Sequence, residues 1–165
     1  MKSSILTIII VAALAIVTGC GNETISNEKI AEQYVEEQGY MVTSRSANVQ
    51  TYVLVKSKLF GSEDSMLYQQ TWGVQKVEPD PYIGKEIAVY GFTVRNHPLE
   101  TIYNRETDIA VMVCEGKVIG GTSFPAQQDE LLMGWPYSLD GQTLEEVTGL
   151  TYQEWSDKWK KKYGS

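Results

Sequence analysis

The segments TDIAVMVC (residues 107–114) and KVIGGTSF (residues 117–124) follow one another with only Glu115 and Gly116 between them. Two strand-like segments joined by a two-residue linker are typical of an antiparallel hairpin, and glycine can adopt the positive φ that such a turn requires. We therefore predict a β-hairpin over residues 107–124, which is the clearest structural signal in the chain.

Further strands are predicted on the N-terminal side of this hairpin, because the sequence takes on a period of two from Tyr40 onward. IAVYGFTV at residues 87–94 has apolar residues in both alternating sets, which predicts a central strand that is buried on both faces. Residues 49–55 and 66–74 also show a period of two, and this pattern predicts two more strands. Two prolines predict a loop over residues 78–81, because proline cannot donate to a strand ladder.

A helix is predicted to precede the strands. Ser26 or Asn27 can cap its N-terminus, the helical pattern continues to about Gln38, and Gly39 is placed to end it. Apolar residues fall on one side of this segment, so we expect the helix to lie against the sheet.

Two helices are predicted to follow the strands. Thr143-x-x-Glu146 and Thr151-x-x-Glu154 are capping-box patterns, and they predict a short helix and then a terminal helix of about three turns. The expected fold class is α+β: an N-terminal helix packed on a mostly antiparallel sheet of about five or six strands, with two short C-terminal helices. We expect all these helices on one side of the sheet.

The N-terminus has the pattern of a secretory signal, with Lys2 followed by an apolar run over residues 5–17 that is too short to span a membrane. The run ends in Val17-Thr18-Gly19-Cys20, which resembles the lipobox of bacterial lipoproteins. This resemblance implies cleavage before Cys20 and a diacylglyceryl group on the Cys20 sulfur, which would anchor the protein to the membrane. The alternatives are an ordinary secretory signal or a short uncleaved anchor.

The expected organisation is a signal peptide at residues 1–19, a lipidated tether at 20–25 and a single α+β domain at 26–165. Removal of the signal peptide, whose only charge is Lys2, changes the formal net charge from −7 to −8. Such an acidic chain is a poor match for nucleic acid, whose phosphates require clustered lysine and arginine. The 17 aromatic residues also exclude an intrinsically disordered chain.

The sequence predicts no catalytic residue, no metal ligand and no cofactor. His97 is the only histidine, and because it precedes Pro98 we expect it in a surface turn. Cys114 is the only thiol left once Cys20 is acylated, and we expect it to act as a small buried hydrophobic residue. Residues 121–125 begin like the nucleophile elbow of hydrolases, but the proline at the last position prevents a helix from following directly.

Two features are candidate interaction surfaces. A glycine- and proline-containing loop carries large aromatic residues at positions 135 and 137, and the alternative is that this loop folds back to cover the sheet. The C-terminal helix combines an aromatic stripe with a lysine cluster, which suggests contact with an anionic envelope polymer or lipid headgroups. The alternative is that the stripe packs on the core. The candidate surface comprises Trp135, Tyr137, Trp155, Trp159, Lys160, Lys161 and Lys162.

Several phrases of the chain resemble a group of small lipoproteins of Gram-positive bacteria that are described as domains of unknown function. The resemblance covers most of residues 28–163, and it implies surface anchoring and a single domain without transferring catalytic residues. The phrases are YQQTWGV (68–74), KEI (85–87), VYGFTV (89–94), VIGG (118–121), YSLDG (137–141) and LEEVTG (144–149).

We therefore expect a non-enzymatic lipoprotein on the extracytoplasmic face of the cell membrane. Its partners would be the membrane, through the anchor at Cys20, and an envelope protein or wall component, with no role for nucleic acid. The alternatives are an inhibitor or modulator of an envelope enzyme and, less favoured, a hydrolase with an unrecognised site.

Overall fold

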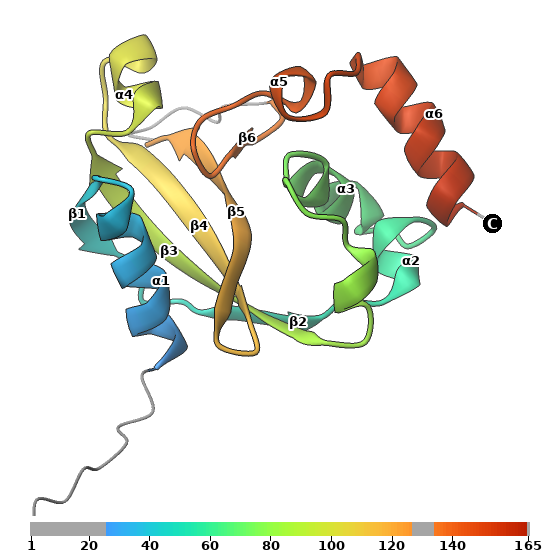
Figure 1. Ribbon diagram of the computed structural model, residues 1–165, viewed down its shortest axis with the longest axis horizontal. Helices are drawn as coiled ribbons and strands as arrows, with labels where there is room; N and C mark the ends of the chain where they lie inside the picture. Colours follow the sequence, from blue (N-terminus) through green and yellow to red (C-terminus); the bar gives the residue numbers. More distant parts are fainter. Residues whose placement is uncertain (1–25, 127–133, 165) are drawn as a thin grey trace, which may run out of the picture.

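The computed structural model describes residues 26–126 and 134–164. The signal peptide and the lipidation site at Cys20 that the sequence predicts lie outside these residues. The described chain is an α+β domain built around a six-stranded antiparallel sheet, in the order β1-β3-β4-β5-β6 with β2 also paired to β3 (Figure 1). The strands are β1 (Met41–Arg45), β2 (Gln50–Val53), β3 (Glu86–Arg95), β4 (Thr107–Cys114), β5 (Lys117–Pro125) and β6 (Tyr137–Ser138).

The predicted hairpin is confirmed as β4 and β5. Glu115 and Gly116 connect the strands with φ values of 50° and 73°, the left-handed conformation that a tight hairpin turn requires at both positions. Further along β5, a Cβ atom on Gly121 would lie 2.2 Å from the carbonyl oxygen of Ala110 in β4. Glycine is therefore required there by the close approach of the two backbones.

The predicted central strand is confirmed as β3. One edge of β3 pairs with β4, and the other edge is shared by β1 at its C-terminal half and β2 at its N-terminal half. Between these two short strands, the amide of Ser46 donates to the carbonyl oxygen of Gly91 at 2.9 Å. The strand predicted over residues 49–55 is shorter than expected, because Val55 already caps the next helix.

The predicted N-terminal helix is confirmed as α1 (Asn27–Glu37). The hydroxyl of Ser26 accepts a hydrogen bond from the amide of Lys29 at 3.3 Å, and Gly39 has a φ of 84° after the helix ends. Helix α1 buries its apolar side against one face of the sheet. The buried cluster on this face, called the α1-face core below, comprises Ala31, Val35, Tyr40, Phe92, Val94, Ile109, Val111, Val113 and Leu139.

Four other helices cover the opposite face of the sheet. The expectation that all helices lie on one side of the sheet is therefore wrong. Alternate residues of a strand point to opposite faces, and Ile87 and Met112 belong to a second cluster that contains no residue of α1. Helices α2 (Lys56–Leu59), α3 (Ser65–Gly73), α5 (Leu144–Thr148) and α6 (Tyr152–Tyr163) contribute to it. The members of this aromatic core are Leu54, Leu59, Trp72, Val74, Ile87, Met112, Cys114, Ile119, Leu144, Trp155, Trp159 and Tyr163.

Residues 66–74 were predicted as a strand, and that prediction is wrong because residues 65–73 form helix α3. Tyr68 and Trp72 are four residues apart, so on a helix they lie on one side, and both pack into the aromatic core. Met66, which the alternating pattern assigned to the same face, is 67% exposed. A short stretch can match both the strand period of two and the helical period of 3.6. Here the helix is the structure that allows Trp72 to pack into the core.

Both predicted capping boxes are confirmed. Thr143 and Glu146 begin α5, and Thr151 and Glu154 begin α6, with the reciprocal side-chain and backbone hydrogen bonds present at each. Four elements were not predicted: helix α2, strand β6, the six-residue helix α4 (Pro98–Tyr103), and a single 3₁₀ turn, η1 (Asp80–Tyr82), within the expected loop.

Candidate functional site

The aromatic side of α6 is buried in the aromatic core. Trp155, Trp159 and Tyr163 follow one another at intervals of four residues and are 6%, 7% and 5% exposed, whereas Tyr152 at the start of the helix is 50% exposed. The rings follow one another along the helix in tilted pairs, with centroids 5.0 Å apart for Trp155 and Trp159 and 4.6 Å apart for Trp159 and Tyr163. This packing is the alternative that the sequence left open for the stripe.

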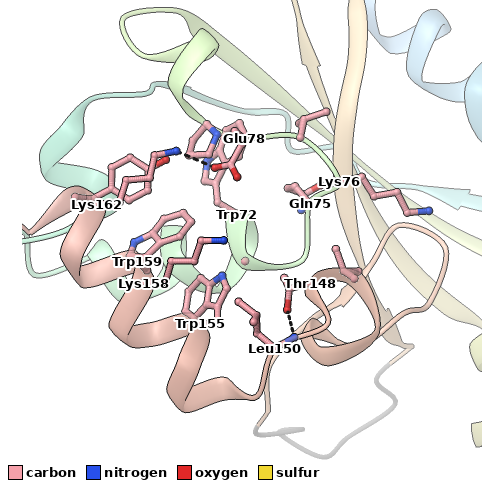
Figure 2. A pocket seen from close by; sticks show the side chains of 15 residues that line it. Trp72, Gln75, Lys76, Glu78, Thr148, Leu150, Trp155, Lys158, Trp159 and Lys162 are labelled. Carbon is pink, nitrogen blue, oxygen red and sulfur yellow. Dashed lines mark hydrogen bonds and ion pairs between the residues drawn. The ribbon is translucent and has the colours of Figure 1, made fainter.

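A pocket of about 290 Å³ lies between α6, the connection from α5 to α6 and the segment that follows α3 (Figure 2). Its size is near the lower end of the range for small-molecule sites. The walls carry three tryptophans, and the charged residues are three lysines and one glutamate. These residues are Trp72, Trp155, Trp159, Lys76, Lys158, Lys162 and Glu78.

The tryptophan walls are held by contacts between segments that are distant in sequence. The indole nitrogen of Trp159 donates to the carbonyl oxygen of Leu59 at 2.8 Å, which ties α6 to α2. Gly73 at the end of α3 allows the closest approach, because a Cβ atom there would lie 2.9 Å from the Trp155 ring and 3.0 Å from the Trp135 ring. The rings are therefore fixed in place before any ligand arrives.

One tryptophan also presents a polar group to the pocket. The indole nitrogen of Trp155 lies on the pocket side of its ring (Figure 2) and has no hydrogen-bond partner within the described residues. The buried indole N–H without a partner in the described residues is that of Trp72, whereas the N–H of Trp155 is accessible on the pocket side, where it can meet water or a ligand. Trp155 is therefore both a wall of the pocket and a donor directed into it.

At the C-terminal end of α6, hydrogen-bonded charged groups form the edge of the pocket. Lys162 donates to Glu78 at 3.0 Å and to Asp80 at 2.6 Å, and the hydroxyl of Tyr163 donates to Asp80 at 2.6 Å. These hydrogen bonds lower the pKa of Asp80. Burial acts to lower the pKa of Lys162, but its bonds to Asp80 and Glu78 raise that pKa overall. Burial raises the pKa of Tyr163 to about 12.

Lys158 differs from Lys162 in having no ion-pair partner within residues 26–126 and 134–164. Its side chain extends from α6 across the pocket, with the ammonium group between the tryptophan rings (Figure 2). Lys76, at the opposite rim, points away from the pocket and pairs with Asp140 at 2.7 Å. Lys158, which is an exposed residue, is thus the lysine of the pocket lining that has no ion pair within the described residues.

Only some of the candidate residues predicted from the sequence line this pocket. Trp155, Trp159 and Lys162 line the pocket, whereas Lys160 and Lys161 are exposed outside it. Trp135 packs edge-on against Trp155 with centroids 5.2 Å apart. Sequence reasoning missed Trp72, because residues 66–74 were assigned to a strand. It also left Lys158 out of the candidate surface, although the spacing of four residues to Lys162 could have indicated that the two share a side of α6.

Tyr137 lies apart from this pocket. With Trp135, Pro136, Tyr152 and residues of the α5 start, it lines a second hollow of about 430 Å³. The hydroxyl groups of Tyr137 and Tyr103 are hydrogen-bonded, which raises the pKa of Tyr137 to about 12.

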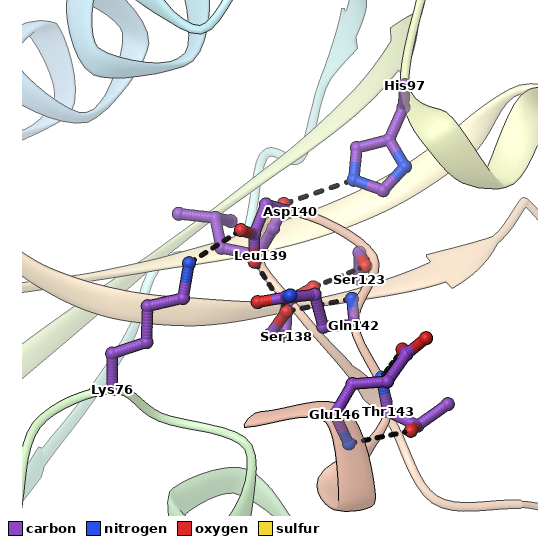
Figure 3. A network of polar contacts seen from close by, with 9 residues as sticks. All are labelled: Lys76, His97, Ser123, Ser138, Leu139, Asp140, Gln142, Thr143 and Glu146. Carbon is purple, nitrogen blue, oxygen red and sulfur yellow. Dashed lines mark hydrogen bonds and ion pairs between the residues drawn. The ribbon is translucent and has the colours of Figure 1, made fainter. Parts of the chain in front are cut away.

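His97 is not in a surface turn, so that prediction is wrong. It is 2% exposed and caps α4, because Pro98 is well suited to the first helical position and the Nδ1 atom of His97 accepts from the amide of Leu99 at 3.1 Å. Its Nε2 atom lies 3.0 Å from the carbonyl oxygen of Leu139 (Figure 3), which requires a donating N–H. Burial lowers the pKa of His97, and both ring nitrogens serve the backbone.

Hydroxyl and carboxylate groups lie near His97 but bond elsewhere. Ser123 donates to the carbonyl oxygen of Ser138, and Ser138 donates to Asp140, both at 2.6 Å (Figure 3). These bonds hold the turn that follows β6. Cys114 is 3% exposed, as predicted, and burial raises the pKa of its thiol.

Among the residues that the structure describes, no group of three or more histidine, cysteine, aspartate or glutamate side chains is placed to hold a metal ion. In the same part of the chain, none of the helices has both the length and the apolar character to cross a membrane. Comparisons with protein-family models, with curated proteins and with solved structures found no match.

Proposed function

We propose that the protein is a lipid-anchored, non-enzymatic binding module on the extracytoplasmic face of the cell membrane, of the lipoprotein kind that the sequence resembles. The observation that supports binding is the pocket beside α6, where an indole N–H and an unpaired ammonium group point into a space between fixed aromatic walls. Convergent polar groups within an aromatic pocket are typical of ligand sites.

The positions of the anchor and the pocket support a partner in the envelope. Cys20 precedes Ser26 by six residues, which span at most about 20 Å of extended chain. Helix α1 therefore stays close to the bilayer when Cys20 is lipidated. Helix α6 lies on the opposite side of the domain from α1 (Figure 1), and residues of α6 line the pocket, so the wall or an envelope protein can reach it.

The anchor is tested by cell fractionation of the full-length chain in a Gram-positive host. Wild-type protein should stay with the membrane and yield an N-terminal peptide whose mass includes a diacylglyceryl group on Cys20. Cys20→Ala should appear in the medium or remain uncleaved. Cys114→Ala removes the other cysteine and should fractionate as wild type. Tight membrane retention of Cys20→Ala would contradict the anchor.

Binding is tested by mixing the detergent-solubilised protein with isolated cell walls and, separately, with membrane proteins from the same host. Saturable retention by either material supports a binding module. Absence of retention by both would contradict it.

A further inference from the structure

The polar groups that face the pocket without an internal partner are both donors. The Trp155 indole nitrogen and the Lys158 ammonium group have no hydrogen-bond or ion-pair partner in the described parts of the chain. The nearby acceptor groups are already engaged: Glu78 binds Lys162, and the hydroxyl of Thr148 both donates to the Leu144 carbonyl and accepts from the Leu150 amide. The ligand must therefore supply acceptors, and a negative charge suits Lys158 best.

The pocket walls indicate the rest of the ligand. Trp72, Trp155 and Trp159 are 2%, 6% and 7% exposed, and they border the pocket with parts of their rings. The rim carries lysine, glutamine, threonine and glutamate side chains. A saccharide ring combines an apolar C–H face, which can lie against an aromatic ring, with peripheral oxygens that can accept from the Trp155 indole N–H and the Lys158 ammonium group. The volume of about 290 Å³ gives room for a ligand of roughly one ring.

We infer that this pocket binds an acidic saccharide, with the sugar ring against the tryptophans and its carboxylate or phosphate on Lys158 and the indole N–H of Trp155. This inference rests on the proposed binding function. Among the lysines of the lining, Lys76 and Lys162 are paired with carboxylates, so within the described residues the unpaired positive charge at the pocket is that of Lys158. An anionic group of the ligand would pair with Lys158.

A lipid headgroup would offer similar anionic chemistry, but the geometry favours a wall saccharide. Helices α1 and α6 lie on opposite sides of the domain (Figure 1), and α6 lines the pocket whereas α1 is the helix tied to the bilayer in the proposed function. A saccharide in the wall reaches the α6 end without any rotation of the domain.

Tryptophan fluorescence offers a direct measurement, because the four tryptophans of the chain are Trp72, Trp135, Trp155 and Trp159. Three of them line the pocket, and Trp135 contacts Trp155. The full-length lipidated protein in a polyoxyethylene detergent is titrated with a glucuronic acid oligosaccharide, with glucose 6-phosphate, with neutral cellotriose and with phosphatidylglycerol vesicles. We expect saturable emission changes with either acidic sugar, weakened by added salt, and at least tenfold weaker binding of cellotriose.

Lys158→Gln tests the assigned contact, because it removes the charge and keeps most of the side-chain length. It should weaken binding of the acidic sugar by about ten- to a hundredfold. Lys160→Gln is the matched control on α6, since Lys160 is exposed and does not line the pocket, and it should bind as wild type. Circular dichroism checks that both variants fold.

Equal binding of acidic and neutral sugars, binding only to vesicles, or no response to either acidic sugar would each overturn the inference. An acidic sugar that binds equally well to wild type and Lys158→Gln would also overturn it. The proposed function fails separately: wall or membrane-protein retention that survives Lys158→Gln keeps the binding module and rejects this pocket.

Discussion

The two faces of the sheet are packed by different means. On the α1 face, aliphatic residues of adjacent strands meet the buried residues of a single helix. On the other face, Trp72, Trp155, Trp159 and Tyr163 carry much of the core, and they come from helices separated by about eighty residues of sequence. The α1 face is formed mainly by residues of hydrogen-bonded neighbouring strands, whereas the aromatic face depends on contacts between segments that are distant in sequence.

The difference shows in the lining of the pocket beside α6, and a second hollow of about 260 Å³ lies beside α1, where Tyr34, Tyr40 and Leu139 contribute to its lining. Small aliphatic side chains interdigitate closely, and their spacing is set by the strand ladder. Large planar rings pack edge-on or tilted, as the ring pairs along α6 do. The lining of the pocket is thus a consequence of the way the aromatic core is assembled.

The comparison predicts that the aromatic face is the more vulnerable to truncation. Trp159→Ala should lower the free energy of unfolding by about 3–5 kcal/mol, since it removes a large buried ring and leaves the carbonyl of Leu59 without its donor. Ile109→Val, on the α1 face, should lower it by about 0.5–1.5 kcal/mol. Urea denaturation followed by circular dichroism measures both, and a Trp159→Ala loss no larger than that of Ile109→Val would contradict the comparison.

A single side chain joins the end of α3 to the sheet, and its removal should have the next largest effect. The Gln75 amide donates to the carbonyl of Gly121 at 2.9 Å and accepts from its amide at 2.8 Å, in the manner of an additional strand residue. Gln75→Ala should lower the free energy of unfolding by about 2–3 kcal/mol, because it leaves both backbone groups unpaired in a buried place.

The neighbouring residue provides the control for Gln75. Lys76 forms an exposed ion pair with Asp140, with side-chain exposures of 64% and 40%, so Lys76→Ala should change stability by about 1 kcal/mol or less. Amide hydrogen exchange at Gly121 localises the effect: it should rise in Gln75→Ala and stay unchanged in Lys76→Ala. Unchanged exchange in Gln75→Ala would show that the bridge does not stabilise β5.

The same contrast explains how much of the fold could be predicted from the sequence. The hairpin of β4 and β5, the central strand β3, helix α1 and both capping boxes depend on local periods, caps and turns, and all of them were predicted. Helix α3 was not, because residues 66–74 alternate as a strand does and only the packing of Trp72 decides between the two periods.

The candidate site was predicted in part for the same reason. The aromatic and lysine spacing on α6 is visible in the sequence, and it identified Trp155, Trp159 and Lys162. The residues that face them across the pocket, such as Trp72, come from the loop and helix around α3. Their proximity to α6 is produced by long-range bonds such as that between Trp159 and Leu59, which no local pattern records.

The smallest of these predicted effects concerns His97, which lies at the end of the α1 face with its ring 4.8 Å from that of Tyr40. Burial lowers the pKa of His97 in the folded protein, whereas the unfolded chain titrates near the ordinary value of about 6.5. Below that pH the unfolded chain binds a proton that the folded chain does not, so stability falls as the pH decreases. One such group gives a slope of at most about 1.4 kcal/mol per pH unit.

Urea midpoints at pH 7.5 and 5.5 measure this loss, and His97→Asn separates it from other titrations because asparagine can cap α4 but does not titrate. The variant should show little change between the two pH values. The carboxylates with lowered pKa values, such as Asp80 and Asp140, are ionised in both states throughout this interval, and the stability they contribute is lost only as the pH falls below about 4. An equal decrease in stability in wild type and His97→Asn would therefore assign the pH dependence of stability to groups other than His97.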